Sequence, residues 1–211
     1  MSDPPPEDPS AAPSRPAAPA PGGPELSGDW EFLSEGWYRV VDAELAGGPA
    51  PMPTAADALD AYVVPIALQK AEAAGLPVPE WFLANEWFPV NVVVYGVNPF
   101  NRSHAVVRTE EQQRVAAKRL TWRCKYTVCC ERIAPETTLV EFRAVGGRAE
   151  SAEFAGWADA VLRVFRLPLA KVRLLRTGDR LELSAIEKLP WKSLSRAERA
   201  FAEEFRRSAL A

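Results

Sequence analysis

A chain of 211 residues is long enough to fill one hydrophobic core, and domains commonly run to about 100–200 residues. The formal net charge is −3, and residues 1–26 carry all of that excess, so the rest of the chain is near neutral. A near-neutral body argues against a nucleic-acid binder that works by phosphate neutralisation, although a local basic cluster lies at 114–125. The longest apolar runs are far shorter than the ~20 residues that a membrane span needs.

The first 26 residues have the composition of a disordered tail. Proline stands at nine positions, and no large apolar residue occurs before Leu26, so burial cannot repay the entropy of ordering. Solubility or tethering is the expected role, and the proline steps are also compatible with polyproline-II ligands. An acidic start without an apolar stretch does not resemble a signal peptide, so we expect a cytoplasmic protein.

Helices are expected in the first part of the folded chain. The apolar pattern of 30–41 fits either a short helix or a strand edge, and the breaker GGPAPMP follows it. Thr54 with Asp57 caps a helix that continues to Gly75, and Pro65 should kink or split it.

The middle of the chain predicts a sheet interrupted by one helix. Strands are expected at 92–97, 104–108, 125–132 and 139–145. Thr109 and Gln112 form a capping box that begins a helix reaching Leu120. Because short turns join most of these strands, they should form one largely antiparallel sheet of an α+β fold.

The last third predicts a helix, a hairpin and a second helix. Apolar residues at helical spacing indicate an amphipathic helix over 151–166. Strands at 169–176 and 181–186 flank a Gly-Asp turn, and Ser195 with Glu198 caps the final helix.

Three cysteines, Cys124, Cys129 and Cys130, make neither a disulfide framework nor a zinc site. Their number is odd, two are adjacent, and the single histidine, His104, does not complete a tetrahedral set. We expect reduced thiols and no bound metal.

Read in order, four stretches resemble the ATP-grasp ligases, which form amide bonds through acyl phosphates. They lie at 70–96 (KAEAAGLPVPEWFLANEWFPVNVVVYG), 109–120 (TEEQQRVAAKRL), 126–147 (YTVCCERIAPETTLVEFRAVGG) and 164–191 (VFRLPLAKVRLLRTGDRLELSAIEKLPW). The resemblance implies an ATP-grasp-like α+β domain over 27–211. Its expected parts are an extension at 27–53, a helix with a lid-like sheet at 54–145 and a C-terminal part at 146–211.

The departures from this resemblance fall on the residues that would perform chemistry. Tyr95 stands near the position of the family's phosphate-binding lysine, Arg173 replaces an aspartate, and Ala185 occupies a glutamate position. The loop at 98–104 lacks the glycine-rich composition of a phosphate cover. Magnesium needs several hard oxygen ligands, so this set is incomplete.

The candidate cofactor-binding residues that remain are Glu131, Glu141, Arg143, Arg102, His104 and Glu187. Strand alternation places Glu131 on one face with Cys129, and Glu141 on one face with Arg143. Such a polar ladder is either a ligand cleft or an exposed face with a cross-strand ion pair.

Three functions are consistent with these residues. The first is a non-catalytic accessory or binding module without a cofactor, whose partner is a ligase or a peptide-modifying enzyme. The second is a carboxylate–amine ligase that uses ATP and magnesium with relocated residues, namely Arg102, Arg143, Glu141 and Glu187. The third is an unrelated protein-interaction domain. No membrane or nucleic-acid partner is expected.

Overall fold

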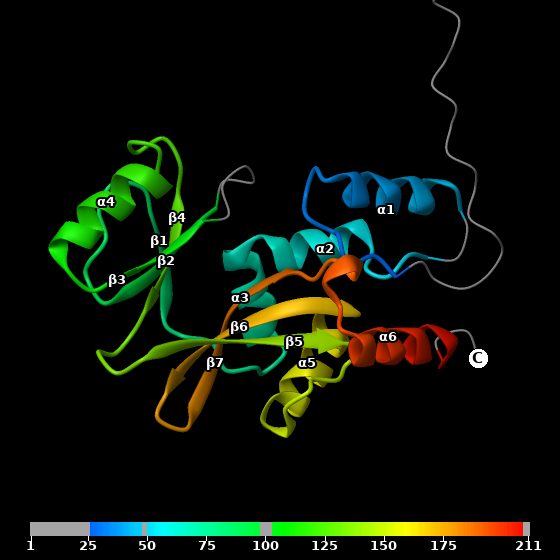
Figure 1. Cartoon of the computed structure of the whole chain (residues 1–211). Coiled ribbons are helices and arrows are strands. Elements are labelled where there is room, and N and C mark those ends of the chain that lie inside the picture. The colour runs from blue at the N-terminus through cyan, green and yellow to red at the C-terminus, as the bar shows by residue number, and fades with distance from the viewer. Residues whose placement is uncertain (1–25, 48–49, 98–102, 209–211) are drawn as a thin grey trace, which may run out of the picture.

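A computed structural model describes residues 26–47, 50–97 and 103–208, which form two antiparallel sheets with packed helices (Figure 1). The first sheet has the order β1-β4-β2-β3 and the second β5-β6-β7. The strands are β1 Trp81–Ala84, β2 Val92–Gly96, β3 His104–Val107, β4 Val128–Arg132, β5 Thr138–Val145, β6 Leu169–Thr177 and β7 Arg180–Lys188. The α-helices are α1 Glu35–Leu45, α2 Ala55–Tyr62, α3 Val64–Ala73, α4 Glu110–Leu120, α5 Ala155–Phe165 and α6 Arg196–Ser208, with short 3₁₀ helices at η1 Ala152–Phe154 and η2 Trp191–Ser193. The expected α+β class is confirmed.

The segment before α2 packs onto the second sheet. The pattern at 30–41, which fitted either a short helix or a strand edge, belongs to helix α1. Ser34 caps this helix by accepting a hydrogen bond from the Trp37 backbone N–H. Trp30 is fully buried, and its indole N–H donates to the Leu169 carbonyl at 3.0 Å. Of the expected tail, only Leu26 lies within the described residues.

The helix expected from Thr54 to Gly75 is split, as the proline predicted. Thr54 and Asp57 form the capping box of α2, and α3 begins directly after it with Pro65 in its first turn. Proline is tolerated there because the first helical N–H groups have no partner within the helix. Gly75 follows the end of α3 with a φ of +77°, which suits a glycine.

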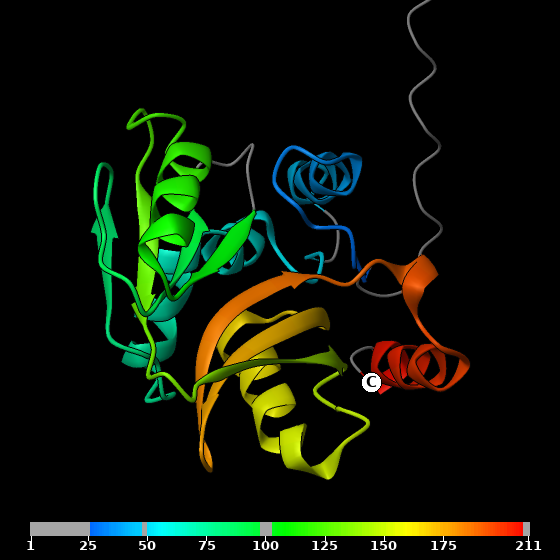
Figure 2. The same cartoon turned by 60° about the vertical axis from the view of Figure 1, so that its left-hand side comes forward.

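The main core lies between the second sheet and helices α2, α3 and α5. Phe142, Val172 and Ile186 point from the three strands into a cluster that also contains Ala61 and Val161. Figure 2 shows α5 beneath the arched strands of this sheet. The opposite face of the second sheet is therefore free to carry polar side chains.

The composition of the sheets differs from the sequence expectation in two ways. Residues 139–145 were expected beside 125–132, but β5 leaves the first sheet and pairs with β6. The pairing of β5 with β6 runs from Thr138 opposite Arg176 to Val145 opposite Leu169, and the Thr137 hydroxyl in the preceding link lies 2.7 Å from that of Thr177 at the end of β6. The edge of β4 is instead taken by β1, a strand that the sequence pattern did not indicate.

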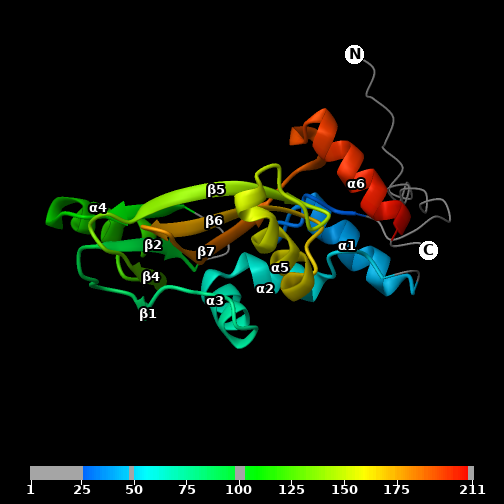
Figure 3. The same ribbon diagram turned by 90° about the horizontal axis from the view of Figure 1, so that it is seen from below.

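Two helices lie at opposite ends of the molecule, α4 on the first sheet and α6 beyond the second (Figure 3). Ser195 and Glu198 form the predicted capping box of α6. Among the described residues, no helix is long and apolar enough to cross a membrane.

Candidate functional site between the sheets

Four side chains form a hydrogen-bonded chain where the two sheets meet. The Arg173 guanidinium donates to the Tyr95 hydroxyl at 3.5 Å, and that hydroxyl lies 2.7 Å from the Ser184 Oγ. Ser184 in turn donates to the Glu131 Oε2 at 2.5 Å. Tyr95 and Glu131 come from the first sheet and the other two from the second, so the chain joins the sheets through polar groups.

Ser184 reaches this chain because β7 contains a bulge. Arg173 pairs with Ala185, whereas the next residue of β6 pairs with Leu183, so Ser184 is the extra residue. Bulges re-aim side chains and are frequent beside functional sites. Leu183 and Ile186 consequently face the main core, and Ser184 and Ala185 both face the first sheet.

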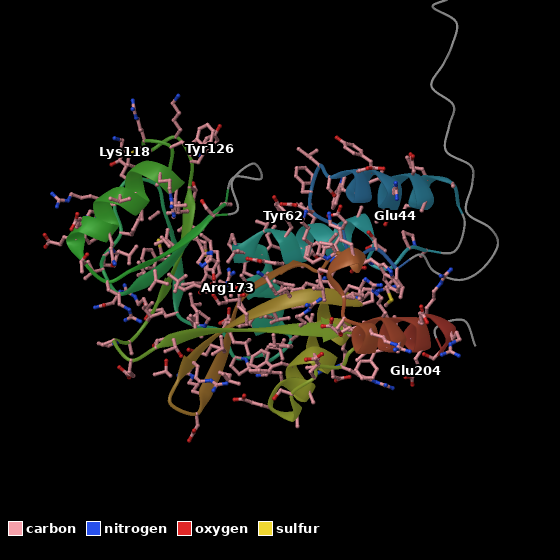
Figure 4. The ribbon with its side chains drawn as sticks, in the orientation of Figure 1. Glu44, Tyr62, Lys118, Tyr126, Arg173 and Glu204 are labelled. Carbon is pink, nitrogen blue, oxygen red and sulfur yellow. The ribbon has the colours of Figure 1, made fainter. Side chains whose placement is uncertain are left out.

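We call the hydrogen-bonded chain of Arg173, Tyr95, Ser184 and Glu131 the relay. Beside it lies an ion-pair cluster made of Lys171, Arg173, Glu141 and Glu187. Arg173 contacts Glu141 through its Nε at 2.9 Å and Glu187 through its Nη2 at 2.8 Å, and Lys171 lies 2.5 Å from Glu187. The four residues lie on neighbouring strands and share one sheet face. Figure 4 places Arg173 at the centre of the molecule, where only 5% of its side chain is exposed. Among the described residues, the cluster contains two cations and two carboxylates, so their formal charges cancel.

The buried end of the relay is poorly solvated. Burial raises the pKa of Glu131 well above its usual range, although the Ser184 hydrogen bond and the Arg173 charge act in the opposite direction. Its Oε1 has no hydrogen-bond partner among the described residues. Burial, followed by the charge of Glu131, also raises the pKa of Tyr95, so the phenol stays protonated and able to donate.

The structure brings four of the six candidate residues together. Glu131, Glu141 and Glu187 lie in the relay or the cluster, and His104 stacks on Tyr95 with 5.5 Å between the ring centroids. Burial and, next, the charge of Arg173 lower the pKa of His104.

The other two candidate residues do not join the site. Arg143 turns toward α6, where it lies 2.8 Å from Glu198 and donates to the Ser193 carbonyl at 2.6 Å. These contacts link β5 to the start of α6. Arg102 lies outside the described residues.

Sequence reasoning missed Lys171 and Ser184 and recorded Tyr95 and Arg173 only as departures from the resemblance. Lys171 and Arg173 alternate along one strand opposite Glu141, so the period of two could have indicated a shared face. For Ser184 no such signal exists, because only the bulge turns it toward Glu131.

The adjacent cysteines are free and point to opposite sides of β4. Cys129 packs with Tyr95, and Cys130 packs on the side covered by α4. Burial and then the charge of Glu131 raise the pKa of Cys130 to about 12, so its reactive thiolate is scarce at neutral pH. Within the described ranges, no group of three or more His, Cys, Asp or Glu residues could hold a metal ion.

The donor set of the site does not fit a divalent cation. Magnesium takes near-octahedral oxygen ligands, usually carboxylates and water. The available carboxylates, Glu141 and Glu187, each already lie within 3 Å of the Arg173 guanidinium. A metal here would have to displace a largely buried cation.

The arrangement of the two antiparallel sheets and their helices is similar to that of solved ATP-grasp proteins. No protein-family model matches the sequence, and no curated protein matches it either. Among solved structures, a RimK domain ATP-grasp protein from Sphaerobacter thermophilus matches with a TM-score of 0.59 at 15% identity, over 82% of this chain and 76% of that one.

D-alanine-D-alanine ligases are similar in structure as well. The enzyme from Helicobacter pylori gives a TM-score of 0.60 at 12% identity, covering 81% of this chain and 68% of that one. The enzyme from Bacillus anthracis gives 0.57 at 10% identity, covering 80% and 73%. The resemblance seen in the sequence is thereby confirmed for the fold.

Proposed function

We propose that this chain is a non-catalytic ATP-grasp-like module that acts in the cytoplasm beside a ligase or a peptide-modifying enzyme. The observation that carries the proposal is the balance of the ion-pair cluster. In the described part of the chain its two cations and two carboxylates lie 2.5–3.6 Å from one another, which supports mutual neutralisation over neutralisation of a ligand.

This balance matters because phosphoryl transfer depends on positioned cations that neutralise the transferred group. To meet a triphosphate, Arg173 would have to leave Glu141 and Glu187. Separating a fully buried ion pair costs about 3–5 kcal/mol, and the cost here is smaller because Glu141 and Glu187 are 42% and 26% exposed and still contact Lys171. A nucleotide would have to supply that free energy before it gained any affinity.

Titration with Mg·ATP tests the proposal. A ligand stabilises the fold by RT ln(1 + [L]/Kd), about 2.7 kcal/mol at a hundredfold excess over Kd. We expect millimolar Mg·ATP to change the melting temperature of the full chain by no more than the same concentration of MgCl₂ does. Isothermal calorimetry should detect only weak heats.

Clear stabilisation by Mg·ATP would favour the alternative function, a carboxylate–amine ligase with relocated catalytic residues. A stabilisation of that size, lost in Glu187→Ala but retained in Arg148→Ala, would overturn the non-catalytic proposal. Arg148 is a suitable control because it makes an exposed ion pair with Glu204. ATP cleavage that depends on a carboxylic acid and an amine would then identify the reaction class.

A further inference from the structure

A second feature lies on the far side of the first sheet from the ion-pair cluster. A hollow of about 700 Å³ is lined by Val115, Lys118, Arg119, Trp122, Arg123 and Lys125. We call these six residues the α4 surface. The first four of these residues recur at i, i+3, i+4 and i+7, so they follow one side of the helix and its end. The buried Ala116 and Leu120 hold the other side of α4 against the sheet.

The α4 surface leaves large apolar side chains in water. Trp122 is 51% exposed, and Val115 and Tyr126 are exposed as well. The rings of Trp122 and Tyr126 meet edge to face, 5.8 Å apart and inclined by 82°. Single exposed apolar residues are ordinary, but Val115 and Trp122 line one hollow and Tyr126 packs beside Trp122, a grouping typical of an interaction site.

The charge of the α4 surface is of one sign. Arg114 adds a fifth cation to the four that line the hollow, and no Asp or Glu occurs between Glu111 and Glu131 in the sequence. Within the described residues, none of these five cations makes an ion pair, whereas Arg132 and Arg148, among others, are paired. The surface is thus complementary to an acidic partner.

The turn after α4 projects these groups at a conformational cost. Trp122, Arg123 and Cys124 have φ values of 49°, 58° and 67°, a left-handed run that side chains with a Cβ disfavour. The buried Thr121 holds the run, because its Oγ1 accepts from the Cys124 N–H at 2.9 Å and its carbonyl accepts from the Tyr126 N–H at 2.9 Å. Strained backbone that its surroundings hold in place is concentrated at functional sites.

We propose that the α4 surface binds an acidic polypeptide segment of a partner protein, with one large apolar side chain of that segment seated in the hollow. Figure 4 shows Lys118 and Tyr126 at the outer end of the first sheet, pointing away from the body. The proposal is independent of the function proposed above, because α4 covers the face of the sheet opposite to that of Tyr95 and Glu131.

A polypeptide suits the surface better than a nucleic acid. Tight binding of nucleic acid typically takes a basic stripe with about 6–10 phosphate contacts, whereas this patch is small and the chain has a net charge of −3. The perpendicular rings of Trp122 and Tyr126 also present no pair of parallel faces on which successive bases would stack. The acidic residues 1–25 of the chain itself contain no large apolar residue after Met1, so they are poorly suited to fill the hollow.

Fluorescence anisotropy with the full-length chain tests this proposal. The probe is a labelled synthetic peptide in which a phenylalanine-leucine pair stands between two blocks of glutamate. We expect saturable binding that weakens at least tenfold in Trp122→Ala and at least tenfold in the charge reversal Arg123→Glu. Lys192→Glu, a charge reversal at an exposed position on η2, is the matched control and should leave the affinity unchanged.

Two further probes separate the alternatives. Replacing the phenylalanine-leucine pair by two serines should weaken binding at least tenfold, and replacing glutamate by lysine should abolish it. The proposal is overturned if the glutamate peptide does not bind at millimolar concentration, if Lys192→Glu weakens its binding as much as Arg123→Glu does, or if an oligouridylate binds more tightly. Melting curves of each variant verify that the fold is retained.

Discussion

Replacing Arg173 by methionine should destabilise the protein more than any other single charge removal in the described part of the chain. The side chain is 5% exposed, while Glu141 is 42% and Glu187 26% exposed. Removing one member of a buried pair costs about 3–5 kcal/mol, and the partial exposure of both carboxylates screens some of that loss. We therefore expect a loss of about 3 kcal/mol, equivalent to roughly 6–12 °C in Tm for a chain of this size.

Urea unfolding followed by tryptophan fluorescence measures this loss. Arg148→Met is the matched control, because Arg148 also makes two hydrogen bonds to one carboxylate, Glu204, at 2.9 and 3.0 Å. Both partners are about half exposed, so the control should lose less than about 1 kcal/mol. Equal losses in the two variants, or no loss in Arg173→Met, would refute the view that burial makes the ion pairs of Arg173 contribute more to stability than an exposed pair does.

Two other predictions concern pH and the N-terminal segment. Because the folded state raises the pKa of Glu131 above its ordinary value of 4.5, stability should fall as pH rises from there through the raised pKa, by up to about 1.4 kcal/mol per pH unit. Glu131→Gln should remove this pH dependence of stability, which urea unfolding at acidic to neutral pH measures. Urea midpoints that run parallel for wild type and variant across this range would contradict the prediction. Deleting residues 1–25 should shift Tm by less than about 5 °C, because their composition offers no core side chains, and a larger drop in calorimetry would show that they are docked.

The sequence by itself determined the local structure well. The capping boxes at Thr54, Thr109 and Ser195 each begin a helix where they predicted one. Such signals are reliable because the bonded groups lie within four residues of one another and do not depend on the rest of the fold. The order of these elements, with the motif spacing, was also enough to indicate the ATP-grasp-like fold that the solved structures confirm.

The strand alternation predicted part of the candidate site. Cys129 and Glu131 do share one face of β4, and that face meets the second sheet. Alternation is local, so it says which residues share a face but not what lies opposite. The sequence therefore did not decide whether these polar residues form an exposed sheet face or line a ligand cleft. That depends on how the two sheets pack.

Only the tertiary structure decided which groups pair. Ser184 meets Glu131 across 53 positions of sequence and Tyr95 across 89, and Arg173 meets Glu141 across 32. The two Ser184 contacts depend on the sheets closing on each other and on the bulge that turns its hydroxyl, whereas the Arg173–Glu141 contact depends on β5 pairing with β6. Arg143 shows the same limit, since its position beside Glu141 suggested the site, whereas the docking of α6 supplies Glu198 as its partner. Local patterns do not distinguish between possible partners of a polar side chain, and only long-range packing decides between them. The relay could therefore be identified only in the folded chain.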